Sequence, residues 1–177
     1  MENKAPVPSY IRRTYEKPRL AKTLSVTSEI IVVLTLLAFS GAIVWKLLTA
    51  PLCALGIALV TAVPYVGVSL FRRFFDAPRP YELYGMTELL GKAPHKTKGH
   101  SFPSRHVFSA FVIAAVLSFV CLPLGIVLAV LGTALAVFRV VLGIHFVRDV
   151  AAGALIGIVS GVIGVFIVNN TLLSAIV

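Results

Sequence analysis

The chain has 177 residues, of which 58% are hydrophobic and only 13% are charged, and its formal net charge is +9. A soluble domain carries about a quarter charged residues, so this composition excludes an ordinary soluble domain and indicates that lipid surrounds most of the surface. The basic excess does not indicate nucleic-acid binding, because no separate basic domain or aromatic platform accompanies it. Anionic membrane lipids or a phosphorylated ligand fit it better.

The first 28 residues are polar and basic, and Pro6, Pro8 and Pro18 are expected to interrupt any long helix there. We interpret residues 1–28 as an interfacial segment that lies against anionic lipid. Residues 29–177 are predicted to form one all-α membrane domain.

Five apolar stretches follow, each near the roughly 20 residues that a bilayer core requires, so we expect a polytopic bundle of about five transmembrane helices. Their approximate limits are 29–48, 51–71, 105–122, 124–143 and 150–173. A polar segment, 72–104, separates the second stretch from the third. Connections of that length are usually functional or disordered, and we interpret this one as an active-site loop.

Glycine recurs at every fourth position of the last stretch, at Gly153, Gly157 and Gly161. Small residues at this spacing let two helices approach closely in lipid. The glycine face is therefore predicted to be a packing surface, and a homo-oligomer is one arrangement that would use it.

Five crossings place the ends of the second and fourth stretches and the starts of the third and fifth on one side, together with the N-terminus. Of the 16 basic residues, only Lys46 lies on the other side. The positive-inside rule therefore favours a multi-pass protein of the cell membrane whose polar segment faces the cytoplasm.

Three polar clusters are predicted to converge on this side of the membrane. They run from Arg72 to Pro80, from Ser101 to His106 and from Phe138 to Asp149. Guanidinium groups bind phosphate oxygens through paired hydrogen bonds, and Arg72, Arg79 and Arg139 would supply three of them. Arg139 lies near the membrane end of an apolar helix, where an ionisable side chain is functional by default.

The second and third clusters also carry groups suited to proton transfer and nucleophilic attack. Ser104 is a candidate N-cap, and the free backbone N–H groups that follow it would face an anion. His145 and Asp149 are four residues apart, so they can share one face of a helical turn. A carboxylate that binds one ring nitrogen leaves the other free to attack, and His106 is then available to protonate a leaving oxygen. His95 and His100 have no partner in the sequence and are interpreted as loop residues.

The clusters resemble the signature motifs of the type-2 phosphatidic acid phosphatase (lipid phosphate phosphatase) superfamily, Lys-x6-Arg-Pro, Pro-Ser-Gly-His and Ser-Arg-x5-His-x3-Asp. The resemblance covers about residues 72–149, with the order and the internal spacings intact. It implies a small bacterial-type membrane enzyme that hydrolyses a lipid phosphomonoester or pyrophosphate through a phosphohistidine, with no metal and no cofactor. Substrates of the phosphatidate, phosphatidylglycerophosphate, polyprenyl pyrophosphate and lipid A types all remain open.

By this resemblance, His145 would be the nucleophile, Asp149 its orienting partner and His106 the general acid. The phosphate ligands would be Arg72, Arg79, Ser104, Arg105 and Arg139. Three motif positions depart from the family pattern: Arg72 replaces its lysine, Arg105 its second-motif glycine and Phe138 its third-motif serine. Val147 and Arg148 also replace the proline and the small residue often found before the aspartate. None of these changes removes a group that forms or breaks a bond, and Arg105 adds a cation.

Other functions remain open. A metal-dependent phosphatase would need a carboxylate cluster, and the acidic residues near the motifs are dispersed. A phosphotransferase or a vanadate-haloperoxidase-like enzyme would use the same anion pocket, although five membrane spans favour a lipid-borne substrate. A non-catalytic transporter subunit or scaffold would need neither histidine of the motifs.

Overall fold

The computed structural model describes residues 6–86 and 99–174, with side chains described as far as residue 170. These residues form helices and no strand, which confirms the predicted all-α membrane bundle. The helices are α1 (Ser9–Tyr15), α2 (Pro18–Thr49), α3 (Pro51–Phe74), α4 (Pro80–Leu83), α5 (Arg105–Val120), α6 (Leu122–Val141) and α7 (Val147–Ser174). A proline occupies the first or second position of α2, α3, α4 and α6. Its missing N–H removes no helical hydrogen bond there.

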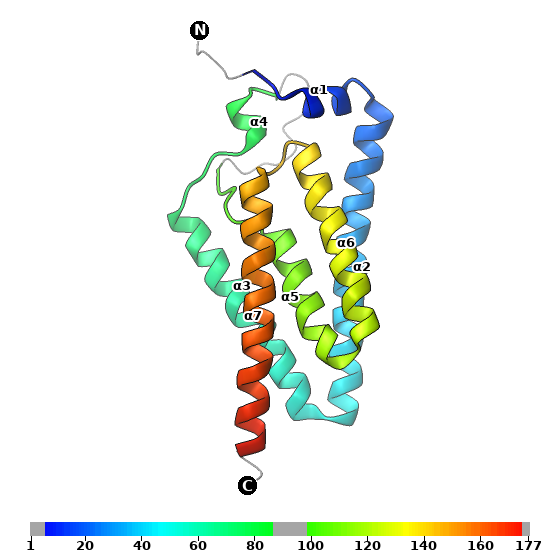
Figure 1. Cartoon of the computed structure of the whole chain (residues 1–177), viewed down its shortest axis with the longest axis vertical. Helices are drawn as coiled ribbons and strands as arrows, with labels where there is room; N and C mark the ends of the chain where they lie inside the picture. The colour runs from blue at the N-terminus through cyan, green and yellow to red at the C-terminus, as the bar shows by residue number, and fades with distance from the viewer. Residues whose placement is uncertain (1–5, 87–98, 175–177) are drawn as a thin grey trace.

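The five long helices run side by side, with α5 between α6 and α7 (Figure 1). α2 and α3 form one antiparallel hairpin around Ala50, and α5 and α6 form another around Cys121. α5 is the central helix, because it packs against α2, α3, α6 and α7. Its residues Phe108, Val112 and Val116 are fully buried in the main core.

Four helices, α2, α3, α6 and α7, are long and apolar enough to cross a membrane, so the chain is a multi-pass membrane protein. The remaining predicted span, 105–122, forms α5, which has 16 residues and a length of about 24 Å. Eight residues of α5 are buried. Because other helices rather than lipid enclose α5, the thickness of the bilayer does not set its length.

The glycine face of α7 packs against α5 of the same chain. A Cβ atom at Gly153 would lie 2.7 Å from the Ser104 carbonyl oxygen, and one at Gly157 would lie 2.7 Å from that of Phe108. A Cβ at Gly161 would lie 2.7 Å from the Cβ of Ala115. The predicted packing role of this face is therefore fulfilled within the chain by α5, and a homo-oligomer through it stays a prediction.

Residues 9–15 and 18–28 of the N-terminal segment are helical. Pro18 follows the end of α1 and begins α2, so α2 starts well before the predicted limit at residue 29. Within α1, Ile11 is buried against Tyr81 and Met86. The Tyr15 hydroxyl donates a hydrogen bond of 3.0 Å to the Leu142 carbonyl oxygen. α1 thus lies across the end of the bundle that carries α4 and the α6–α7 turn (Figure 1).

Candidate active site

The three polar clusters meet at this end of the bundle, as predicted. The Ser101 N–H donates to the Ala77 carbonyl oxygen at 2.9 Å, which joins the first cluster to the second. The Ser104 N–H donates to the Asp149 carbonyl oxygen at 2.9 Å, which joins the second to the third. Part of the polar segment, residues 87–98 with His95, lies outside the described residues. The buried polar residues of the site are Arg72, Arg79, Ser101, Ser104, Arg139, His145 and Asp149.

The turn between α6 and α7 presents His145 to the site. Gly143 has a positive φ of 64°. The Gly143 N–H donates a hydrogen bond to the Val140 carbonyl oxygen, and the Ile144 N–H donates one to the Arg139 carbonyl oxygen. This pair of hydrogen bonds is a Schellman motif, which ends a helix and reverses the chain through a left-handed residue. His145 follows directly, before α7 begins at Val147.

Replacing Gly143 with alanine is expected to lower the free energy of unfolding by about 1–2 kcal/mol, because a side chain disfavours the left-handed conformation. Its Cβ would also approach Ile11 and Met86 at 3.3 and 3.4 Å. Thermal unfolding in detergent measures the effect, and kcat should fall as well because the turn carries His145. Gly67→Ala is the matched control, since a Cβ there meets nothing within 4 Å. Equal melting temperatures for the two variants would contradict the prediction.

His145, Asp149 and Ser101 form a buried group. The Ser101 hydroxyl donates to Asp149 Oδ2 at 2.5 Å and lies 3.3 Å from His145 Nδ1. His145 Nδ1 and Asp149 Oδ2 are 3.6 Å apart. Asp149 Oδ2 also accepts the Phe146 N–H at 3.0 Å, so the carboxylate caps the first turn of α7 as well. The four-residue spacing correctly indicated that His145 and Asp149 lie together, whereas Ser101 begins the second cluster and had no predicted role.

The environment of His145 keeps its imidazole neutral. Burial lowers its pKa from 6.5 to about 4. The Asp149 carboxylate opposes this shift, and the positive charge of Arg79 adds to it. A neutral imidazole has a free lone pair, so His145 is in the form that a nucleophile requires at neutral pH.

This pKa predicts how activity depends on pH. Because the folded-state pKa is depressed, His145 stays unprotonated as the pH falls from 7 to 5 and becomes a cation only near pH 4. We expect kcat/KM, corrected for the second ionisation of a phosphate monoester at about pH 6, not to fall between pH 7 and about pH 5, because His145 stays neutral there and a lower pH can only assist the general acid. A corrected profile that still falls through an apparent pKa near 6.5 would contradict this.

Arg72 and Arg79 enclose the backbone that precedes α5. Arg72, at the end of α3, donates hydrogen bonds from Nη1 to the carbonyl oxygen of Pro103 and from Nη2 to that of His100. Arg79 donates from Nε to the Gly99 carbonyl oxygen at 3.1 Å. Burial is the main cause that lowers the pKa of Arg79, and repulsion from Arg105 contributes. The two arginines therefore reach the site, but they also hold its loop in place.

Arg139 is almost fully buried and pairs with Glu29, for which no role was predicted. Its Nη2 donates to Glu29 Oε1 of α2 at 3.0 Å. Its Nε is buried and has no hydrogen-bond partner among the described residues. A buried donor without an acceptor is costly, and such groups in native proteins often mark functional sites. In the sequence, the one indication of a role for Glu29 was its position as a carboxylate at the start of a predicted membrane span.

The N-terminus of α5 closes the site on the remaining side. Ser104 occupies the predicted N-cap position, but its hydroxyl makes no capping bond and is buried without a hydrogen-bond partner among the residues that the structure describes. The first intrahelical bond runs from the Phe108 N–H to the Ser104 carbonyl oxygen at 2.9 Å. The backbone N–H groups of residues 105–107 precede it, and such groups bind anions at helix N-termini.

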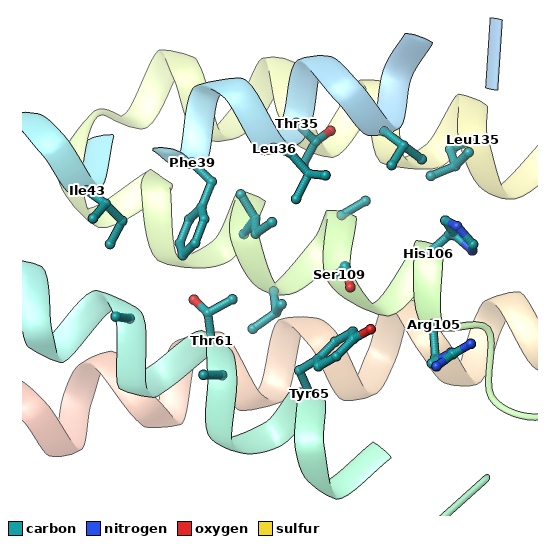
Figure 2. Close-up of a pocket in the computed structure, with 16 residues that line it drawn as sticks. Thr35, Leu36, Phe39, Ile43, Thr61, Tyr65, Arg105, His106, Ser109 and Leu135 are labelled. Carbon is teal, nitrogen blue, oxygen red and sulfur yellow. The ribbon is translucent and has the colours of Figure 1, made fainter. Parts of the chain in front are cut away.

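A cavity of about 600 Å³ extends from this region between α2, α3, α5 and α6. Figure 2 shows Arg105 and His106 at one end of it, with the aromatic ring of Tyr65 nearby and Ile43 toward the other end. Arg105 and His106 are both exposed. The walls between the ends are mostly apolar, contributed by residues such as Leu36, Phe39, Ala58, Ala62, Val112 and Ile113.

Possible metal ligands do not cluster in the described part of the chain. No group of three or more histidine, cysteine, aspartate and glutamate residues is placed there to hold an ion. The polar groups that converge are mostly guanidinium groups, backbone N–H groups, hydroxyl groups and imidazoles. Of the carboxylates, Asp149 binds Ser101 through Oδ2 and Glu29 binds Arg139 through Oε1. This donor set suits a phosphate anion better than a cation.

Comparison with known proteins relates this site to a family. The sequence matches the PAP2 superfamily over residues 51–172, which include every predicted site residue. The crystal structure of Aquifex aeolicus LpxE is similar, with a TM-score of 0.65 and 25% sequence identity over 88% of this chain and 92% of that chain. The curated proteins contain no match. Because the family match covers more than half of the chain, this protein belongs to the PAP2 superfamily and is a membrane phosphatase of the phosphoric ester hydrolase class.

Proposed function

We propose that this protein hydrolyses a phosphomonoester or pyrophosphate of a membrane lipid through a phosphohistidine at His145, without a metal ion. The observation that carries the proposal is a neutral, buried imidazole, hydrogen-bonded through Ser101 to Asp149, beside buried arginines at one end of a membrane bundle. Phosphate monoesters hydrolyse extremely slowly in water, so the rate must come from charge stabilisation and from dividing the reaction into two steps.

In the first step, Nε2 of His145 attacks phosphorus in line with the leaving oxygen. A phosphorus–nitrogen bond forms as the bond from phosphorus to the lipid oxygen breaks. The electron pair of the broken bond stays on that oxygen, and His106 supplies the proton that neutralises it. The exposed position of His106 at the end of the cavity supports this role.

In the second step, water attacks the phosphohistidine. His106, now neutral, accepts a proton from the water as the new phosphorus–oxygen bond forms and the phosphorus–nitrogen bond breaks. Inorganic phosphate leaves, and both histidines return to their starting forms. Arg72, Arg79, Arg139 and the backbone N–H groups that follow Ser104 would stabilise the phosphoryl oxygens in both steps.

The shape of the cavity supports a lipid substrate. It begins at Arg105 and His106 and continues between helices that lie in the bilayer, with mostly apolar walls. A phosphate group at the polar end would therefore place a hydrocarbon chain along the cavity. The concentration of basic residues at the polar end supports a cytoplasmic position for the site.

The test combines a substrate panel with direct detection of the intermediate. Purified protein in detergent is assayed for phosphate release from phosphatidate, phosphatidylglycerophosphate, a polyprenyl pyrophosphate and lipid A, with and without EDTA. Rapid quenching with a ³²P-labelled substrate should yield an acid-labile, base-stable phosphoprotein that the His145→Gln variant does not form. Loss of activity in EDTA that is restored by a divalent cation would refute metal independence. Turnover without any phosphoprotein would refute the covalent step.

A further inference from the structure

Ser101 lies between His145 and Asp149, the two residues that the family resemblance pairs directly. Its hydroxyl is 2.5 Å from Asp149 Oδ2 and 3.3 Å from His145 Nδ1, whereas the latter two atoms are 3.6 Å apart. A separation of 3.6 Å is too long for a hydrogen bond. The connection from carboxylate to imidazole therefore runs through the serine oxygen.

The burial of these three residues removes solvent as an alternative partner. Ser101 and Asp149 have no exposed surface, and His145 is 3% exposed. Their positions are held from several elements, because the Ser101 N–H binds the Ala77 carbonyl oxygen and Asp149 caps α7 through the Phe146 N–H. Ser101 thus makes a defined contact within a packed site.

The chemistry of the three groups gives this connection a direction. An ionised carboxylate only accepts hydrogen bonds, so the short contact to Asp149 uses the single proton of the Ser101 hydroxyl. The serine oxygen can then only accept from His145, which requires the proton of the neutral imidazole to be on Nδ1. That tautomer leaves the lone pair on Nε2.

We propose that Ser101 is a positioning residue that couples Asp149 to His145 and holds the imidazole with Nδ1 protonated and Nε2 free to attack. This inference rests on the proposed function, in which Nε2 forms the bond to phosphorus. When that bond forms, the ring becomes a cation, and the chain Nδ1–H···Oγ–H···Oδ2 brings the charge of the carboxylate to bear on it. Ser101 would therefore stabilise the phosphorylated state more than the free state.

Loss of the hydroxyl should lower kcat and leave substrate binding intact. We expect Ser101→Ala to lower kcat by about 10- to 100-fold, which is the effect of one hydrogen bond to a charged group, and to change KM by less than about threefold. Ser118→Ala is the matched control, because Ser118 lies at the opposite end of α5 and its hydroxyl binds only the Ala114 carbonyl oxygen of its own helix. It should retain wild-type kcat.

A double-mutant cycle separates coupling from a general structural effect. If Ser101 acts through Asp149, the Ser101→Ala/Asp149→Asn protein should be no slower than the slower single variant, within about twofold. Losses that multiply, or a Ser101→Ala variant with unchanged kcat, would overturn the proposal. A phosphoprotein that still forms slowly in Ser101→Ala but not at all in His145→Gln would show that the covalent mechanism holds independently of this result.

The wild-type protein offers a second measurement that needs no Ser101 variant to fold. The chain has only four histidines, so ¹⁵N-histidine labelling gives a simple spectrum in which His145→Gln identifies the His145 signals. The expected signature is a protonated Nδ1 and an unprotonated Nε2 at neutral pH. A proton on Nε2 in the free enzyme would overturn the proposal even if Ser101→Ala were slow.

Discussion

Replacing His145 with glutamine is expected to lower kcat by at least about 1000-fold, whichever leaving group the substrate carries, because the variant lacks the nucleophile itself. Replacing His106 with glutamine should act differently. A general acid contributes about 100-fold or more with an alkoxide leaving group, which needs a proton, and far less with a p-nitrophenolate, which does not. The two variants therefore differ in how their loss of kcat/KM, which reports the first step, depends on the leaving group.

The comparison uses one lipid phosphate and p-nitrophenyl phosphate with each purified variant. Recovery of kcat/KM of His106→Gln to within about tenfold of the wild type on the aryl substrate is the expected result, while its kcat stays low because the second step still uses His106 as the base. If His145→Gln recovered equally on the aryl substrate, His145 could not be the nucleophile and the two assigned roles would be wrong. Retained thermal stability in both variants is the necessary control, since His145 is buried beside the α6–α7 turn.

Replacing Gly153 with alanine is expected to reduce stability and activity together. The added Cβ would lie 2.7 Å from the Ser104 carbonyl oxygen and 3.3 Å from the Phe108 nitrogen, and neither backbone atom can rotate away. Overpacking of this kind lowers the free energy of unfolding by about 1–3 kcal/mol. Ser104 is the N-cap residue of α5, so displacing its backbone also moves the helix N-terminus that would face phosphate. We therefore expect kcat to fall as well.

Gly157→Ala and Gly41→Ala make this prediction specific. At Gly157 the Cβ would meet the Phe108 carbonyl oxygen at 2.7 Å, one turn further into the bundle, so stability should fall with a smaller effect on kcat. At Gly41 a Cβ meets nothing within 4 Å, and alanine should be neutral or stabilising by up to about 1 kcal/mol because it favours the helix. If all three variants had the same melting temperature, close packing of α7 on α5 would not explain the glycine spacing.

Much of the molecule could be predicted because the bilayer restricts its options. Apolar stretches of membrane length must be helices, so the bundle and the common side of the three clusters followed from residue order. The separation of four residues also indicated that His145 and Asp149 lie close together, and their side chains are 3.6 Å apart although His145 lies in the turn before α7. The roles of the predicted phosphate ligands stay predictions, although the structure brings all of them to one end of the bundle or to the cavity that begins there.

The contacts that depend on long-range packing could not be predicted. Ser101 and Asp149 are 48 residues apart, and Glu29 and Arg139 are 110 apart, so no local spacing indicates either hydrogen bond. The glycine pattern on α7 indicated close packing but not its partner, because a helix of this chain and a helix of a second copy present the same chemistry to it. The residue sequence by itself determined the helices, their order and the chemical groups at one membrane face. Only the tertiary structure decided which of those groups touch, because that depends on how four helices pack around α5.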